Sequence, residues 1–378
     1  MTDYTIRKNC IFCNSELLNN FFENDYSIPL AIYNKYKNNK DAKKIPFNVL
    51  CCQKCFTYQI KYLGNINEVY DNNNADNCGS IRTDMNDEFA IFIKNNINDI
   101  NSILEVGAGS GSLSTSILNY IQNINYTILE PFYFGIKENR NIINDYIENV
   151  DLTSINTNIL IMSHVFEHFY EPLKIIEKIA NSKNIEYVCL NHPDLENNVK
   201  NNSYNVNVLN LEHTYYIENN FLKTLFLKYG FELIAEQKYK EYSILLIFKR
   251  TYDVNNEIVL KNEKSVNDIT IFYNGILNKV NKINNLLTII DNNIDIHIFP
   301  CSYHTSYLFV FGLKANYFKS ILDNSTTKIN KYLNSYDIIC ESCNDFLENN
   351  KKSIVVLNGG CFNNELNLNK ASNIIFLT

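Results

Sequence analysis

Residues 102–112 form a glycine-rich turn whose residue types suit the binding of a nucleoside. The strand-like stretch ahead of the turn carries Glu105. The three glycines of the turn are Gly107, Gly109 and Gly111. Glycine lets the backbone turn sharply and approach a ligand closely, and the helix expected next would present free N–H groups. A second predicted strand ends in Glu130, where a carboxylate can accept hydrogen bonds from both ribose hydroxyls. This order favours a nucleoside site over an ordinary tight loop.

The spacing of the glycines separates this turn from that of dinucleotide enzymes. Those enzymes favour G-x-G-x-x-G with an acid about 20 residues further on, whereas this chain has G-x-G-x-G with Glu105 just ahead of it. The variant resembles motif I of the class I methyltransferases that use S-adenosylmethionine. The resemblance implies that Glu105, the three glycines and Glu130 bind S-adenosylmethionine. His164, the first residue after a later strand, is predicted to join them, with a plain loop residue as the alternative.

The segment from His164 to His168 has the H-x-x-E-H pattern of inverted zinc peptidases. That chemistry needs the motif inside a helix, where the two histidines share a face. Here the motif follows directly on a predicted strand at 158–163, so it lies at the carboxyl edge of the sheet, where open α/β folds bind ligands. The position disfavours a peptidase.

Glu212 and His213 form a third group with chemical potential, after a predicted strand that ends in Asn191-His192-Pro193. Imidazole titrates near neutral pH, so a histidine beside a glutamate at this edge suits proton abstraction from a substrate. Transfer of a methyl group to carbon or oxygen needs such a base, because the nucleophile must lose a proton. An exposed loop histidine is the alternative, and the residues alone leave both open.

Two C-x-x-C hooks near the N-terminus have the pattern of a zinc site. The predicted ligands are Cys10, Cys13, Cys52 and Cys55. Such hooks supply four thiolates in a tetrahedron, and a disulfide framework is not expected in a cytosolic chain. Cys51 is a possible substitute ligand, and reduced structural thiols are the alternative to a metal. A third hook, Cys340–Cys343, has no partner pair nearby and is attributed to chance.

The composition narrows the partners and the location. The 378-residue chain has a formal net charge of -7 and no sustained basic run, which argues against nucleic acid as the main partner. The N-terminus lacks the pattern of a signal peptide, and no window approaches 18 uninterrupted apolar residues. We therefore expect a cytoplasmic, soluble protein without a membrane partner. The sequence does not specify its oligomeric state.

The chain divides into three predicted parts: a zinc-binding module at 1–80, an α/β methyltransferase domain at 81–250 and a Rossmann-like α/β domain at 251–378. The expected strands of the central domain lie at 102–107, 126–130, 145–150, 158–163 and 187–190. One helix is expected between Glu130 and about residue 141 and another at 218–229, followed by a hairpin of strands 231–235 and 243–248. Parallel strands finished by an antiparallel hairpin match the seven-stranded methyltransferase sheet. The C-terminal part is expected to contain a helix at 269–290 and strands at 295–299, 317–323, 353–357 and 373–377, without a G-x-G turn.

The order of these motifs resembles that of the three-domain sugar C-methyltransferases, which modify nucleotide-linked deoxysugars. The resemblance covers essentially the whole chain, including Asp323 and Lys328 in the C-terminal part. It implies that His168, Glu212 and His213 handle protons at the sugar, with His213 as the base.

The chain departs from the family at two places. It has Asn210 where carbon-methylating members have a tyrosine, and residues 74–80 lack the family's tyrosines. Methylation of a sugar oxygen, which needs only a base and alignment, therefore stays an alternative.

Two other classes of function fit the sequence less well. A non-catalytic protein that binds a nucleotide-linked sugar would be expected to lose Glu105, Glu130 or a loop glycine, and all are present. A nucleotide-sugar oxidoreductase would need a Tyr-x-x-x-Lys pair, and the nearest such sequence, at 58–62, lies in the predicted zinc module.

Overall fold

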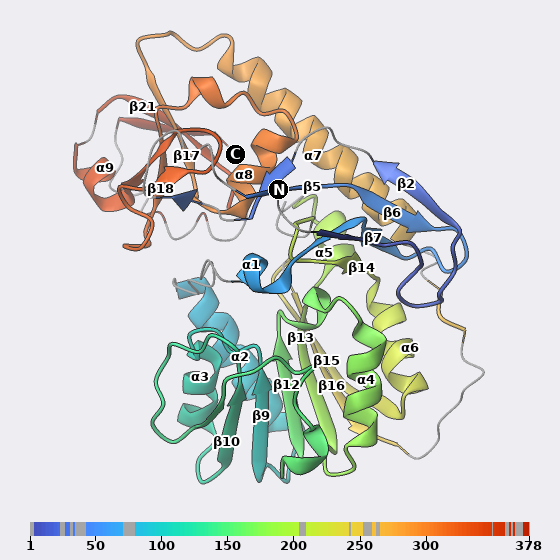
Figure 1. Ribbon diagram of the computed structural model, residues 1–378. Helices are drawn as coiled ribbons and strands as arrows, with labels where there is room; N and C mark the ends of the chain where they lie inside the picture. Colours follow the sequence, from blue (N-terminus) through green and yellow to red (C-terminus); the bar gives the residue numbers. More distant parts are fainter. Residues whose placement is uncertain are drawn as a thin grey trace.

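The computed structural model describes residues 4–22, 27–30, 33–34, 43–70, 80–203, 209–241, 243–251, 259–261, 265–349, 351–359, 363, 366 and 373–377. Figure 1 shows a central α/β domain below, with the C-terminal sheet and the N-terminal strands above it. The long helix α7 (Ser265–Leu287) runs across the upper parts. No helix in these residues has the length and apolar character needed to cross a membrane.

The central domain is built on one seven-stranded sheet. Its strands are β9 (Ser102–Val106), β10 (Asn125–Leu129), β11 (Asn141–Ile143), β12 (Ile159–Ser163), β13 (Tyr187–Pro193), β15 (Phe231–Tyr239) and β16 (Ser243–Arg250). They lie in the order β11-β10-β9-β12-β13-β16-β15. The first five are parallel, and β16 runs antiparallel to β13 and β15. This order confirms the predicted class I methyltransferase sheet.

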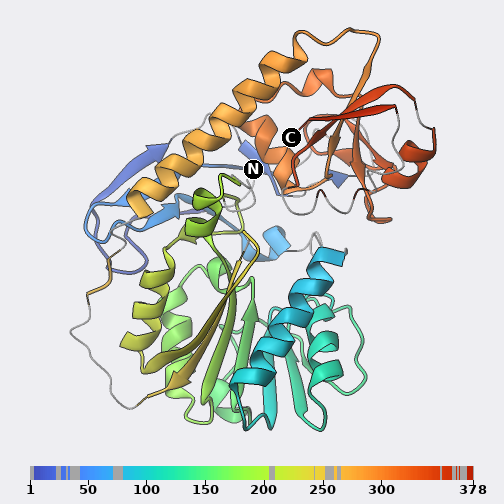
Figure 2. The ribbon, with the colours of Figure 1, turned by 180° about the vertical axis from the view of Figure 1, so that it is seen from behind.

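Side-chain alternation along the strands fills a core on each face of this sheet. Ile103 packs with α2 (Ser80–Asn96) and α3 (Ser112–Tyr120), while Leu104 packs on the opposite face with α4 (Pro172–Asn181) and α6 (Asn219–Lys228). Both faces are apolar because parallel strands are covered by helices on both sides. Figure 2 shows α2 lying across the face that is turned away in Figure 1.

Two predicted elements after Glu130 are wrong. Residues 131–140 form turns in place of a helix, and the third strand is β11, which ends before the predicted 145–150. Tertiary contacts explain the missing helix. A Cβ at Gly135 would lie 2.0 Å from the Ser110 carbonyl oxygen, and the Arg140 guanidinium donates to the hydroxyls of Ser114 and Thr115. The segment packs on the glycine turn instead of on its own helical turns.

The N-terminal module shares a sheet with the central domain. Strand β14 (Tyr215–Tyr216) of the central domain pairs with β7 (Tyr58–Ile60), followed by β6 (Val49–Cys52) and β2 (Leu18–Phe22). The module's other elements are β1 (Tyr4–Ile6) with β8 (Tyr62–Gly64), β3 (Ser27–Pro29) with β5 (Lys44–Pro46), and α1 (Ile66–Tyr70). The residues just after His213 thus belong to the module's sheet.

The C-terminal part is a second α/β unit. Its strands are β17 (Asp295–Phe299), β18 (Ser320–Asp323), β19 (Tyr332–Leu333), β20 (Ile339–Ser342), β21 (Ser353–Leu357) and β22 (Ile374–Leu377), and its helices besides α7 are α8 (Tyr303–Val310) and α9 (Cys343–Asn349). The sheet order is β22-β21-β17-β18-β20-β19-β4, where β4 (Tyr33–Asn34) comes from the N-terminal module. The predicted strands at 295–299, 353–357 and 373–377 are confirmed, and the one predicted at 317–323 begins at Ser320.

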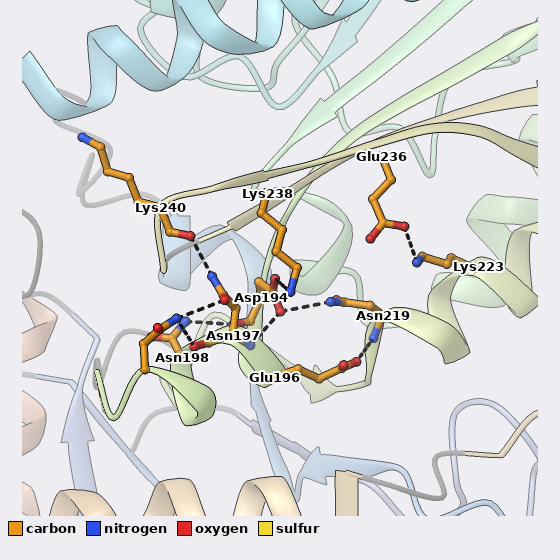
Figure 3. Close-up of polar contacts among 10 residues, drawn as sticks. Asp194, Glu196, Asn197, Asn198, Asn219, Lys223, Glu236, Lys238 and Lys240 are labelled. Carbon is orange, nitrogen blue, oxygen red and sulfur yellow. Dashed lines mark hydrogen bonds and ion pairs between the residues drawn. The ribbon is translucent and has the colours of Figure 1, made fainter.

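Short elements complete the chain: η1 (Leu152–Ser154), η2 (Phe166–His168), η4 (Ala315–Tyr317) and α5 (Leu195–Lys200). Figure 3 shows how α5 is held. Asp194, which is fully buried, caps α5 by accepting from the Asn197 backbone N–H at 3.0 Å and also accepts from the Asn219 side chain at 3.0 Å. Glu196 accepts from the Asn219 backbone N–H at 2.9 Å, so one network joins α5 to the start of α6. Since α5 packs on α7, this network also links the central domain to the C-terminal part.

Candidate active site

The glycine turn follows β9, and two of its glycines are required by close packing. Gly107 and Gly111 have φ of 73° and 75°. A Cβ at Gly107 would lie 2.4 Å from a methyl group of Val165, and one at Gly111 would lie 2.5 Å from the Tyr133 hydroxyl. A side chain at either position would be strained and would collide, so the turn needs glycine there.

Glu130 follows β10 and lies directly beside this turn. One carboxylate oxygen accepts from the Gly109 backbone N–H at 3.0 Å, and the other accepts from the Phe132 N–H at 3.1 Å. The side chain is partly exposed at the carboxyl edge of the sheet. This is the arrangement expected of a carboxylate that receives ribose hydroxyls.

Glu105 has a partner inside the protein. Its carboxylate accepts from the Tyr126 hydroxyl at 2.7 Å, and the side chain is 2% exposed. Burial raises the pKa of Glu105 to about 7, although the hydrogen bond from Tyr126 opposes the rise. Its contact with the cofactor stays a prediction.

Four of the six histidines of the chain surround Glu167 at the end of β12 and β13. A carboxylate oxygen of Glu167 lies 3.3 Å from His164 Nδ1 and 3.9 Å from His213 Nε2, and the other oxygen lies 3.4 Å from His192 Nδ1. Side-chain atoms of Glu167, His168 and His213 lie within 4.8 Å of one another. The motif occupies a loop and a single 3-10 turn, with His164 at a φ of 54°, so the helix that a peptidase would need is absent from it.

The charge state of this cluster follows from burial and hydrogen bonding. Burial lowers the pKa of His164 and of His168 to about 4, which leaves both imidazoles neutral near pH 7. Burial alone would raise the pKa of Glu167, but the hydrogen bond from His164 and the nearby His192 ring hold it well below its usual range. The cluster therefore carries an ionised Glu167 carboxylate beside the neutral imidazoles of His164 and His168.

Asn191, in the middle of this edge, provides a test of fit for a polar cofactor. The residue is 1% exposed and its amide nitrogen donates to the Ser163 hydroxyl at 3.2 Å. Among the residues that the structure describes, its Oδ1 has no hydrogen-bond partner. A buried oxygen in this state costs free energy unless a ligand donates to it. S-adenosylmethionine has an ammonium and hydroxyl groups that can serve, so the residues fit it.

The loop at 209–214 carries Glu212 and His213, and Asn210 shapes it. The Asn210 side-chain oxygen accepts from the backbone N–H of Glu212 at 2.8 Å and of His213 at 2.9 Å. The ring of His213 lies 5.2 Å, centroid to centroid, from that of His168. Asn210 thus holds the turn that presents the two residues, a role that a tyrosine cannot perform with its side chain.

Two tyrosines at the site escape sequence reasoning because they come from other parts of the chain. The hydroxyl of Tyr70, at the end of α1, lies 3.0 Å from His168 Nδ1. The hydroxyl of Tyr303, the first residue of α8, donates to the Leu30 carbonyl at 3.0 Å and lies beside the Glu212 carboxyl group. Most of the segment at 74–80, where tyrosines are missing from the sequence, lies outside the described residues. The structure nonetheless supplies phenols next to His168 and Glu212.

The four predicted cysteines of the N-terminal module converge. Their sulfur atoms all lie within 4.8 Å of one another, with Cys10 and Cys55 at 3.4 Å and Cys13 and Cys52 at 3.5 Å. A tetrahedron with bonds of about 2.3 Å to zinc has sulfur–sulfur edges of about 3.8 Å, so the group has the size of such a site. Cys51 lies outside this group. Cys189 and Cys301, elsewhere in the described residues, are buried.

The module holds the residue that follows His213. The Thr214 carbonyl accepts from the Ile60 backbone N–H at 3.0 Å and from the buried Arg7 guanidinium at 3.3 Å. Arg7 also donates to the Tyr170 carbonyl at 3.2 Å. The loop with His213 is therefore fixed on one side by the cysteine module.

Residues 80–236 match the family model of a methyltransferase domain. Together with the strand order and the contact between Glu130 and the glycine turn, the match defines the central domain as a class I methyltransferase. The protein therefore contains an S-adenosylmethionine-dependent methyltransferase domain at residues 80–236. No curated protein sequence matches the chain.

Several solved structures match part of this chain at low identity. The 1,6-didemethyltoxoflavin-N1-methyltransferase of Burkholderia thailandensis is 9% identical over 43% of this chain and 77% of its own, with a TM-score of 0.35. The PH0226 protein of Pyrococcus horikoshii OT3 is 12% identical over 47% and 95%, with a TM-score of 0.38. An O-methyltransferase family protein from Burkholderia thailandensis is 11% identical over 48% and 60%, with a TM-score of 0.36. These similarities carry no inference about the acceptor.

Replacing Glu130 by alanine is expected to weaken S-adenosylmethionine binding by about tenfold or more, because bonds from hydroxyls to a carboxylate are charge-assisted. Calorimetry on the full chain measures the change. Glu138→Ala, on the exposed loop of the same region, is the matched control and should bind like the parent. Equal affinity of the Glu130 variant and the parent would contradict the assignment.

Proposed function

We propose that this protein transfers a methyl group from S-adenosylmethionine to a carbon atom of a nucleotide-linked sugar in the cytoplasm, with His213 as the general base. The observation that carries the proposal is the convergence of groups from all three parts of the chain. His168 and His213 come from the central domain, Tyr70 from the N-terminal module and Tyr303 from the C-terminal part. Such a concentration of hydrogen-bonding groups suits an acceptor with many hydroxyls.

The surroundings of His213 suit a base. When bound, S-adenosylmethionine supplies an electrophilic methyl group on a sulfonium. The acceptor must lose a proton, and His213 would take it. Ionised Glu167, 3.9 Å from His213 Nε2, would stabilise the imidazolium that then forms. His168 stays neutral near pH 7 and would hydrogen-bond the acceptor.

The two phenols support carbon as the acceptor atom. Removal of a proton beside a sugar carbonyl leaves charge on the carbonyl oxygen, and a positioned O–H donor lowers the barrier to that step. Tyr70 and Tyr303 bring O–H groups to the site although the sequence lacks tyrosines at the family's positions. Methylation of a hydroxyl would need the base but not these donors.

We also propose that the cysteine group of the N-terminal module holds zinc in a structural role. Four thiolates leave no open position on a tetrahedral ion, and such sites stabilise folds instead of activating substrates.

The function is tested by incubating the full-length protein with S-adenosylmethionine and nucleotide-linked sugars, both keto and non-keto. Mass spectrometry and NMR of the products identify the acceptor atom. Methylation of a keto-sugar carbon, with solvent deuterium entering at that carbon in D2O, is the expected result. Methylation at oxygen without exchange would assign the alternative, and no transfer to any sugar would contradict the substrate class.

A further inference from the structure

We propose that the C-terminal domain completes the active site, with Tyr303 positioning Glu212 and Tyr307 holding the backbone beside it. The inference rests on the proposed function and assigns a task to a domain that has no glycine turn of its own. It starts from the spacing of the two tyrosines on α8. Residues four apart lie on the same face of a helix, so both phenols point toward one surface.

That surface is the loop that carries the base. The Tyr307 hydroxyl accepts from the Leu211 backbone N–H, and the Tyr303 hydroxyl lies beside the carboxyl group of the next residue, Glu212. Both tyrosines are buried, and their rings meet edge to face at 6.0 Å. One helix of the C-terminal domain therefore bonds the loop backbone at Leu211 and places a phenol beside the side chain of Glu212.

The start of α8 is itself held in place, which makes it suitable for positioning. The Ser302 side chain caps the helix by accepting from the His304 N–H at 3.2 Å, and the Thr305 hydroxyl donates to the Pro300 carbonyl at 2.5 Å. In the structure the Tyr303 hydroxyl donates to the Leu30 carbonyl of the N-terminal module at 3.0 Å. The phenol thus stands where all three parts of the chain meet.

The single proton of the phenol links this contact to the charge of Glu212. The Leu30 carbonyl can only accept a hydrogen bond. The Glu212 carboxyl group accepts hydrogen bonds when it is ionised and can donate one when it is protonated. When Glu212 is ionised, the phenol can donate to it, and this bond favours the ionised form. Burial acts in the opposite direction and dominates, raising the pKa of Glu212 to about 7.

Other groups also face Glu212 and bear on its titration. The carboxylate of Glu167 on the neighbouring loop raises the pKa of Glu212 further. The phenols of Tyr70, Tyr170 and Tyr307 lie within electrostatic range of Glu212 and are neutral near pH 7, because each has a raised pKa. Loss of the Tyr303 hydroxyl should therefore move the pKa of Glu212 in one direction, upward.

The test uses Tyr303→Phe in the full-length protein. We expect kcat/KM for the sugar to fall about tenfold or more, since one hydrogen bond to a charged group is lost, with S-adenosylmethionine affinity within twofold of the parent. The limb of the pH–rate profile that disappears in Glu212→Gln should move to higher pH. Tyr307→Phe should lower turnover without moving that limb. Tyr317→Phe, a partly buried tyrosine of the same domain, is the matched control.

A second readout does not depend on the substrate. Because the pKa of Glu212 is raised, its contribution to stability is present below its ordinary value near 4.5 and is lost as pH rises to about 7. In Tyr303→Phe the loss of this stability contribution should extend to higher pH. It is measured by comparing the unfolding midpoint of each variant with that of Glu212→Gln across the pH range. An unmoved pH dependence in Tyr303→Phe, or an equal movement in Tyr307→Phe, would overturn the positioning role. If this readout holds but no sugar is methylated, the proposed function fails and the contact stands.

Discussion

Replacing His213 by asparagine is expected to lower turnover by about a hundredfold to ten-thousandfold, the usual cost of removing a general base. Asparagine keeps a hydrogen-bonding group but cannot take a proton near neutral pH. The Asn210 side chain accepts from the backbone N–H of residue 213, a bond that the replacement keeps, so the loop should keep its shape. Single-turnover kinetics with the acceptor identified by product analysis measures the change.

The affinity for S-adenosylmethionine serves as the internal control for this variant. The glycine turn and Glu130 make their contacts on β9 and β10, away from the loop at 209–214. Calorimetry should therefore give nearly the parental value for His213→Asn. Parental turnover in the variant would remove His213 from the role of base. Equal loss of turnover and cofactor binding would show that the loop supports the cofactor instead.

Loss of the metal from the N-terminal module is expected to have the second large effect. The parent should contain one zinc per chain, and a double replacement of Cys10 and Cys52 by serine should contain none. Metal binding to such hooks contributes about 10–16 kcal/mol to folding. Without it, β7 should no longer pair with β14, and Ile60 and Arg7 should release the Thr214 carbonyl. We expect turnover to fall more than about a hundredfold through disorder of the base.

Cys51→Ser provides the matched control, because Cys51 is adjacent to Cys52 but lies outside the group of four sulfur atoms. It should retain the metal and most of the activity. Elemental analysis, circular dichroism and turnover measured on the same preparations separate the cases. Zinc retained after both Cys10 and Cys52 are replaced would refute the ligand assignment. Full turnover in a metal-free variant would refute the coupling between the module and the base.

Local features of the sequence determined the glycine turn and the cysteine group. The turn at Gly107 and Gly111 requires positive φ and tolerates no Cβ, and only glycine meets both conditions. Strands β9 and β12 are short apolar runs, because a strand of a parallel sheet is buried on both faces. The cysteine hooks are recognisable because a tight turn places two thiols on one metal. These requirements act over a few residues, so the pattern of types reveals them.

Only the tertiary structure decided what surrounds His213, the proposed base. Tyr70 is 98 residues from His168, and Leu211 is 96 residues from Tyr307. Contacts between such distant residues depend on how separate sheets pack, which no local pattern encodes. The same reason explains the missing helix after Glu130, where packing on the glycine turn overrides local helical preference. It also explains why β14 of the central domain pairs with the N-terminal sheet and β4 of the N-terminal module pairs with the C-terminal sheet. An edge strand can pair with any sheet edge that the packing places beside it.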